Sequence, residues 1–224
     1  RRTRGHKRLD AERIAALEPD LAGRFAEGLF FAEEAHLDPR RTLEALAERL
    51  RERGVALHFG RRVAPADLDH HRIIDARGIA ARPELPRLRA VRGEMVLLRT
   101  REVSLSRPVR LLHRSPIYVV PRADGLFMVG ATMLESDDDR GITLRGTVEL
   151  LNAAYALHPA FAEAELAETG AGLRPSYADN LPKVTRSGRV VSLNGLYRHG
   201  FLLSPAMAAE AAAEIFAETL KDAS

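Results

Sequence analysis

Four short apolar runs follow one another in the middle of the chain, and this pattern constrains the fold more than any other feature. Each run has the length of a single strand, and turn signals such as Ser115-Pro116 and Asp124-Gly125 separate them. Strands joined by short turns predict an antiparallel sheet with the connectivity of a meander. The four predicted strands are Glu94–Thr100, Val109–His113, Ile117–Pro121 and Leu126–Ala131.

Helical and strand-like segments alternate on either side of this sheet. The helix predicted at Asp38–Arg53 has an aspartate as N-cap, Pro39 in its first turn and Gly54 after its last residue. The other predicted helices are 10–17, 143–157 and 205–220, and the other predicted strands are 55–59, 72–76, 165–173 and 189–193. We therefore predict a mixed α+β and α/β fold, in which an antiparallel sheet interrupts an α/β region.

Composition predicts a globular protein without a membrane partner. The chain has 224 residues, of which 46% are hydrophobic and 29% are charged. The apolar segment 201–220 is interrupted by three glutamates, and no secretory signal is visible. The absence of cysteine excludes disulfides and thiolate metal sites, and it fits the cytoplasmic location that we expect. Because residue 1 is arginine, we expect a fragment or a processed chain.

Charge does not predict a nucleic-acid partner. The whole chain has a formal net charge of +3. Basic residues concentrate in the first 13 positions, so the remainder of the chain is close to neutral. A short basic segment on a neutral body is a weak electrostatic signal for nucleic acid, and we expect none to bind.

Two clusters of glycine and arginine near the C-terminus are the candidates for chemistry. The first is Gly170-Ala-Gly-Leu-Arg-Pro175, and the second is Asn194-Gly-Leu-Tyr-Arg-His-Gly200, which leads into the last helix. Glycines allow a flat ligand to approach the backbone, and an arginine side chain pairs well with a carboxylate. The alternative is a strand with a solvated arginine, followed by a helix that a turn caps.

These stretches resemble the C-terminal signature of the D-amino-acid oxidase family of FAD-dependent oxidoreductases, most closely its glycine oxidases of thiamine biosynthesis. Tyr118-Val-Val-Pro-Arg122, Gly130-Ala-Thr-Met133, Val91-Arg-Gly-Glu94 and Asp75-Ala-Arg-Gly78 also match in family order. The resemblance covers nearly the whole chain. It implies oxidation of glycine or a small amino acid to its imine, with hydride transfer to FAD and with O2 as the acceptor.

The resemblance also implies a role for individual residues. Arg174 would pair with the substrate carboxylate, Tyr118 would donate a hydrogen bond to it, and Arg198 would lie close by. Met133 would form a wall of the small substrate pocket. Val63 and Gly78 would contact the adenine side of FAD through their backbones. The flavin ring would be lined by Gly172, Leu173, His199, Gly200, Phe201, Leu202 and Leu203, with the last helix directing its N-terminus at the ring.

The same resemblance divides the chain into two discontinuous domains. Residues 1–37 and 82–168 would form the antiparallel-sheet substrate domain. Residues 38–81 and 169–224 would form a partial FAD-binding domain of the Rossmann type.

One expected sequence is missing from this chain. The family's Gly-x-Gly-x-x-Gly fingerprint after a strand, which holds the diphosphate, is not present. We therefore expect a missing N-terminal FAD-binding segment, little or no FAD on this chain alone, and an uncovered apolar face that promotes homo-oligomers. Two alternatives stay open: a D-amino-acid or sarcosine dehydrogenase that passes electrons to a carrier, and a non-catalytic binding module.

No metal site is predicted. His70-His71 lies in a turn before a strand, and we interpret both side chains as solvated. The Asp137–Asp139 run lacks the alternate spacing and the closing glutamate of a calcium loop. His36 and His113 are interpreted as surface or core polar residues.

Overall fold

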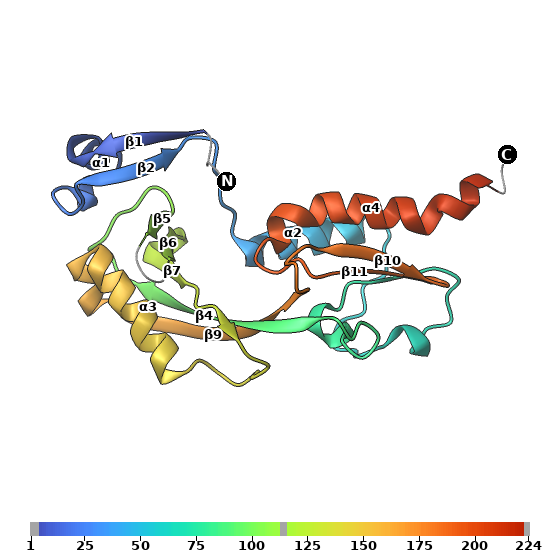
Figure 1. Cartoon of the computed structure of the whole chain (residues 1–224). Coiled ribbons are helices and arrows are strands. Elements are labelled where there is room, and N and C mark those ends of the chain that lie inside the picture. The colour runs from blue at the N-terminus through green and yellow to red at the C-terminus, as the bar shows by residue number, and fades with distance from the viewer. Residues whose placement is uncertain (1–4, 113–115, 222–224) are drawn as a thin grey trace. The chain divides into compact units, whose positions relative to one another are not determined.

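The computed structural model describes residues 5–112 and 116–221, and it divides into two compact units (Figure 1). Unit 1 comprises Arg1–Asp38, Gly93–Met133 and Asp139–Gly172, and unit 2 comprises Pro39–Arg92, Leu134–Asp138 and Leu173–Ser224. Two long strands, β4 (Arg89–Arg99) and β9 (Glu165–Ser176), each run from one unit into the other. Residues 82–92 and 134–138 cluster with unit 2, although we expected them in the substrate domain. Asp38 and residues 169–172 cluster with unit 1, although we expected them in the partial FAD-binding domain.

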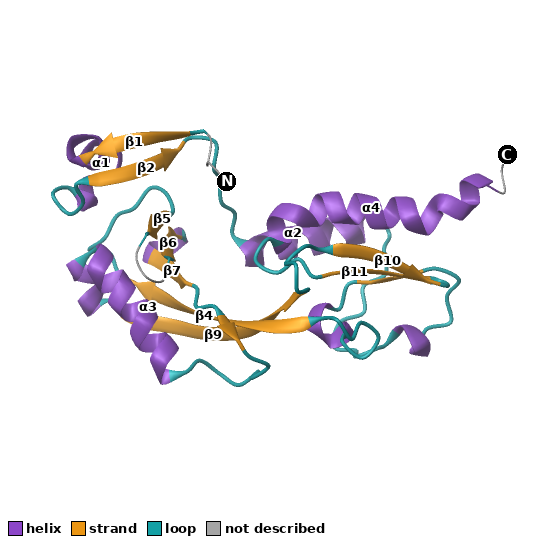
Figure 2. Cartoon of the chain, viewed as in Figure 1, coloured by secondary structure: helices purple, strands orange, loops and turns teal. Residues whose placement is uncertain are grey.

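Unit 1 is built on the antiparallel sheet that the apolar runs predict (Figure 2). Its strands β5 (Val109–Leu111), β6 (Ile117–Pro121) and β7 (Leu126–Gly130) pair in sequence order. Strand β4 pairs with β7 and not with β5, because the connection 100–108 is too long for a hairpin and carries the chain across the sheet. Strand β9 pairs with β4. His113 lies outside the described residues.

Helices cover the apolar side of this sheet. Helix α3 (Leu144–Leu157) begins after Thr143, whose hydroxyl accepts a hydrogen bond from the Gly146 N–H at 3.0 Å. Its buried leucines join the valines and leucines of β4, β6 and β7 in one core. Helix α1 (Ala11–Leu17), capped by Asp10, adds Ile14 to that core between β1 (His6–Asp10) and β2 (Glu27–Phe31). Neither β1 nor β2 was predicted from the sequence.

Unit 2 contains a small mixed sheet that one helix covers. Strand β11 (Val190–Asn194) pairs antiparallel with β10 (Lys183–Ser187) and parallel with β3 (Ile73–Asp75). Helix α4 (Gly200–Lys221) lies along these strands, with Ala211 and Ile215 packed against Val191 (Figure 1). It begins at Gly200, five residues before the predicted start. Strand β10 and the short β8 (Leu134–Glu135) were not predicted.

The strand predicted at 55–59 is wrong. Helix α2 (Pro39–Glu52) ends as expected at Gly54, which has a φ of +74°. The residues that follow form no strand, because none of the described strands supplies hydrogen bonds to them. Val55 and Phe59 are exposed in consequence.

Apolar side chains stay exposed on two helices of unit 2. No described residue of α2 is buried, and Leu43, Leu46 and Leu50 are each more than 40% exposed. Residues 200–217 of α4 are long and apolar enough to span a membrane by length and composition. One helix of this kind is weak evidence for a membrane span, since helices of other proteins pass the same test.

Candidate functional site

The carboxyl ends of two neighbouring parallel strands meet at one edge of the unit 2 sheet. Asp75 ends β3 and pairs in register with Ser192, two residues before Asn194 ends β11. In open α/β sheets, ligands bind at this edge because the loops after the strands come together there. The turn after β3 and the loop after β11 therefore form the candidate site.

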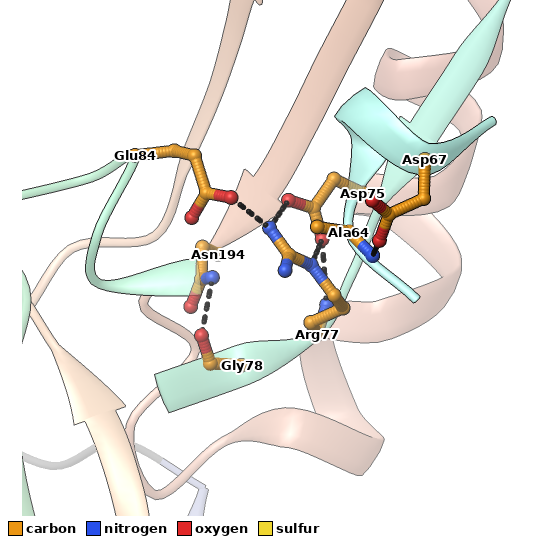
Figure 3. A network of polar contacts seen from close by, with 7 residues as sticks. All are labelled: Ala64, Asp67, Asp75, Arg77, Gly78, Glu84 and Asn194. Atoms are coloured by element: carbon orange, nitrogen blue, oxygen red, sulfur yellow. Dashed lines mark hydrogen bonds and ion pairs between the residues drawn. The ribbon is translucent and has the colours of Figure 1, made fainter. Parts of the chain in front are cut away.

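A buried ion pair fixes the turn after β3 (Figure 3). The Arg77 guanidinium donates through Nε to Asp75 Oδ1 at 2.9 Å and through Nη2 to Asp75 Oδ2 at 2.8 Å. Nη2 also lies 2.9 Å from Glu84 Oε1. The hydrogen bonds from Arg77 hold the pKa of the Asp75 carboxyl below its ordinary value, against the opposing effect of burial. Asp75 in turn raises the pKa of Arg77.

We expect this ion pair to make the free energy of unfolding depend on pH in the acid range. A carboxyl whose pKa is lowered by folding stabilises the fold above its unfolded pKa of about 4, and the contribution is lost as the pH falls further. We expect Asp75→Asn to lower the free energy of unfolding by about 1–3 kcal/mol near neutral pH. The difference from the parent protein should stay constant down to about pH 5 and shrink below about pH 4. Urea unfolding at a series of pH values measures it, and a difference that persists unchanged in acid would contradict the assignment.

Asn194 joins this turn to the loop after β11 (Figure 3). Its side chain is buried, its Nδ2 donates to the Gly78 carbonyl at 2.8 Å, and its Oδ1 accepts from the Gly195 N–H at 2.8 Å. Gly195 has a φ of +80°, and a Cβ there would overlap the Tyr177 ring. Burial, followed by the nearby charge of Asp179, raises the pKa of the Tyr177 phenol. The Asn194 side chain therefore links the turn after β3 to the loop after β11.

The loop after β11 also runs beside the Arg174 segment. The Tyr197 N–H donates to the Pro175 carbonyl at 3.0 Å, so the neighbours of Arg198 and Arg174 are hydrogen-bonded to each other. Arg174 is half-buried on β9, whereas Arg198 is exposed. The loop then turns into α4, where the Leu203 N–H donates to the His199 carbonyl at 2.9 Å. Backbone and side-chain hydrogen bonds thus link the Arg174 segment, the loop that contains Arg198 and the Gly78 turn within unit 2. The roles predicted for the two arginines stay predictions.

At two of the predicted cofactor residues, Gly172 and Gly200, neither packing nor backbone conformation requires a glycine. A Cβ added at Gly172 or at Gly200 would meet no atom within 4 Å, and neither residue has a positive φ. Gly141, in the loop before α3, shares these properties. By contrast Gly78 has a φ of +62°, and this backbone conformation alone explains why the residue is a glycine. Open space over Gly172, in unit 1, and over Gly200, in unit 2, leaves the backbone at each accessible to a ligand.

The other predicted cofactor residues differ in exposure. Phe201 and Leu202 in the first turn of α4 are exposed, Leu203 and Leu173 are half-buried, and His199 is exposed. Val63 lies in the loop before β3 and is 36% exposed. Exposed apolar side chains at a helix N-terminus are available to a ligand, but nothing in this geometry assigns Val63 to one.

Tyr118 and Met133 belong to unit 1. Tyr118 on β6 pairs with Gly130 on β7, and a Cβ at Gly130 would stand 3.2 Å from the Tyr118 hydroxyl. The glycine therefore lets the phenol ring lie across the neighbouring strand in one orientation. Met133, which follows β7, is 53% exposed. Their roles toward a substrate stay predictions.

Comparison with known proteins now decides the family. The sequence matches the family described as FAD dependent oxidoreductase (DAO) over residues 1–214. The chain belongs to this family. The resemblance on which the sequence analysis relied is confirmed, as is the mixed fold.

Two relatives and one solved structure show how far the similarity extends. A protein of Rhizobium etli named as a thiamine biosynthesis oxidoreductase, ThiO, is 61% identical over 219 residues, which is 97% of this chain and 67% of the relative. A glycine oxidase of Bacillus licheniformis is 26% identical over 88% of this chain and 59% of its own length. The fold is similar to that of a glycine oxidase from Bacillus cereus, with a TM-score of 0.80 at 23% identity over 94% of this chain and 65% of that one. The chain thus spans about two thirds or less of the length of these proteins.

Sequence reasoning missed the residues that hold the site in place. Asp75, Arg77 and Asn194 were not singled out for a role, although all three lie in stretches that were quoted for their resemblance. The sequence feature that could have identified Asp75 and Arg77 is Asp-x-Arg-Gly at the end of a strand. In a turn, the side chains of an aspartate and an arginine two residues apart can form an ion pair. Among the described residues, no group of three or more histidine, aspartate or glutamate side chains could hold a metal ion.

Proposed function

We propose that this protein is the substrate-binding and flavin-ring-binding part of an FAD-dependent amino-acid oxidase of thiamine biosynthesis. It would oxidise glycine or another small amino acid to the imine, with O2 reduced to H2O2. The observation that supports this most directly is the Tyr197–Pro175 hydrogen bond, which places the Arg174 segment beside the loop that enters α4. Arg174 carries a guanidinium that suits a carboxylate. The adjoining segment leads to the N-terminus of α4, which suits a flavin ring that gains negative charge.

In this proposal each part of unit 2 has a separate task. Arg174 binds the substrate carboxylate with two parallel hydrogen bonds, and Pro175 after it restricts the backbone that carries the side chain. The first N–H groups of α4 are unpaired within the helix and favour negative charge on the pyrimidine edge of the flavin. When bound, FAD supplies the acceptor for the hydride that leaves the α-carbon. Tyr118 donating to the substrate and Met133 enclosing it stay predictions from the resemblance.

The glycine at position 172 provides a test that separates flavin binding from folding. Gly172→Ala should leave the free energy of unfolding of the flavin-free protein nearly unchanged, because the new Cβ meets no protein atom within 4 Å. It should weaken FAD binding by about 10-fold or more, since a methyl group in a tight contact with the ring displaces it. Titration of protein fluorescence with FAD gives the dissociation constant.

Gly141→Ala is the matched control, because its Cβ also meets no protein atom. It should leave FAD affinity unchanged, and its stability should match or slightly exceed that of the parent. Equal FAD affinity in Gly172→Ala and the parent protein would remove Gly172 from the flavin site. Both measurements use the protein expressed from its complete reading frame.

Substrate and electron acceptor are tested together. We expect glycine, sarcosine or D-alanine to bleach the flavin absorbance and to consume one O2 for each H2O2 formed. Flavin that is bleached by the amino acid but not reoxidised by O2 would favour the dehydrogenase, and no bleaching by any of them would favour the binding module.

We further propose a cytoplasmic location, which the absence of cysteine supports, and self-association through the exposed leucines of α2.

A further inference from the structure

The buried side chain of Asn194 links two turns of unit 2. It is 1% exposed, and it lies between two turns that come from different parts of the sequence. The amide nitrogen reaches the Gly78 carbonyl, and the amide oxygen receives the Gly195 N–H, both at 2.8 Å. One side chain thus satisfies a backbone acceptor and a backbone donor that are 117 positions apart in the chain, from residue 78 to residue 195.

The turn on the Gly78 side is itself held rigidly. Arg77 precedes Gly78 and is clamped by Asp75 and Glu84, with its backbone N–H also donating to Asp75 Oδ1 at 3.1 Å. This clamp fixes the backbone up to residue 77, and the bond from Asn194 fixes the carbonyl that follows (Figure 3). The turn is therefore hydrogen-bonded both within itself and to the loop after β11.

The loop on the Gly195 side sets where α4 begins. Gly195 leads to Tyr197, which is held by Pro175, and the His199 N–H donates to the Leu196 carbonyl at 2.9 Å before the helix starts at Gly200. Five residues separate Asn194 from the helix, and hydrogen bonds hold the loop at Gly195, Tyr197 and His199. Asn194 is thus connected to the N-terminus of α4 by a short, hydrogen-bonded loop.

We propose that Asn194 is a positioning residue for the flavin, and this rests on the proposed function. It couples the Gly78 turn, assigned to the nucleotide side of FAD, with the N-terminus of α4, assigned to the ring. An aspartate of the same shape would keep the acceptor for the Gly195 N–H but would lose the donor to Gly78. It would set a carboxylate oxygen against that carbonyl, and the two turns would separate.

The test compares Asn194→Asp with Val191→Ala in the protein expressed from its complete reading frame. Val191 is fully buried under α4 on the same strand, so its truncation lowers stability without touching either turn. For each variant, FAD titration gives the dissociation constant, the visible spectrum at saturating FAD reports the ring environment, and thermal unfolding reports stability.

We expect Asn194→Asp to raise the FAD dissociation constant by about 5- to 100-fold and to shift the flavin absorbance bands at saturation. Val191→Ala should lower the unfolding temperature while leaving the spectrum at saturation unchanged. If both variants lose FAD affinity only in proportion to stability and keep the parent spectrum, Asn194 is a structural residue and the inference fails. If the parent protein binds FAD and Asn194→Asp binds it equally well, the inference fails while the proposed function stands. A parent protein that binds no FAD overturns both.

Discussion

Gly146→Ala is expected to destabilise unit 1 by about 3–5 kcal/mol, a large part of the total stability of a typical domain. Gly146 lies in the first turn of α3, and a Cβ there would overlap the carboxylate of Glu94. That carboxylate is fully buried and accepts from the Thr143 N–H at 3.0 Å and from the Thr132 and Thr143 hydroxyls, each at 3.3 Å. The methyl group would displace a buried carboxyl group from its hydrogen-bond partners, and leaving buried polar groups unsatisfied is costly. Chemical denaturation of both proteins measures the difference.

The clash predicts a specific pattern in a double-mutant cycle. Glu94→Ala should also destabilise, because it leaves the Thr143 N–H without its acceptor, yet it removes the atoms that the new methyl group would strike. The double variant should therefore be more stable than the sum of the two losses implies. Gly141→Ala serves as the control for replacing a glycine ahead of α3, and its stability should match or slightly exceed that of the parent. Strictly additive losses would show that Gly146 acts through something other than the Glu94 carboxylate.

The second large effect is expected at Arg174, measured in the flavin-loaded enzyme. Arg174→Ala should lower kcat/KM for glycine by about 30-fold to several thousand-fold, because removing one partner of a buried charge pair costs about 2–5 kcal/mol. Flavin content should remain that of the parent enzyme, since the assigned contact is to the substrate. Arg174→Lys should restore only part of the loss, because lysine keeps the charge without the two-pronged geometry.

Arg49→Ala is the matched control for the loss of an arginine in the same unit. Arg49 lies on α2, is 65% exposed and pairs with Glu52 at 2.8 Å. Its replacement should leave both kcat/KM and flavin content unchanged, since an exposed pair of this kind contributes little. If Arg174→Ala keeps the parent kinetics, or if it loses flavin as readily as activity, Arg174 does not bind the substrate carboxylate.

The sequence by itself determined the family, the mixed fold class and most of the regular elements. Helices α1, α2 and α3 carry their own end signals, because Asp10 and Thr143 cap locally and Gly54 adopts a conformation that few other residues tolerate. The strand β6 was predicted with its actual bounds, since five residues between two turn signals leave little choice. Such features depend on neighbours a few positions away, and a linear sequence contains all of those neighbours.

Tertiary structure decided everything that depends on a distant partner. Residues 55–59 have the pattern of a strand but form none, while 6–10 and 27–31 pair although neither was predicted. Strand β4 pairs with β7, and no local feature of residues 94–100 distinguishes that partner from β5. Asn194 shows the same limit in the site: its importance comes from the carbonyl of Gly78 and the N–H of Gly195, which the fold brings together. A hydrogen bond or a strand pair is a property of two segments, so the sequence of either one alone does not specify it.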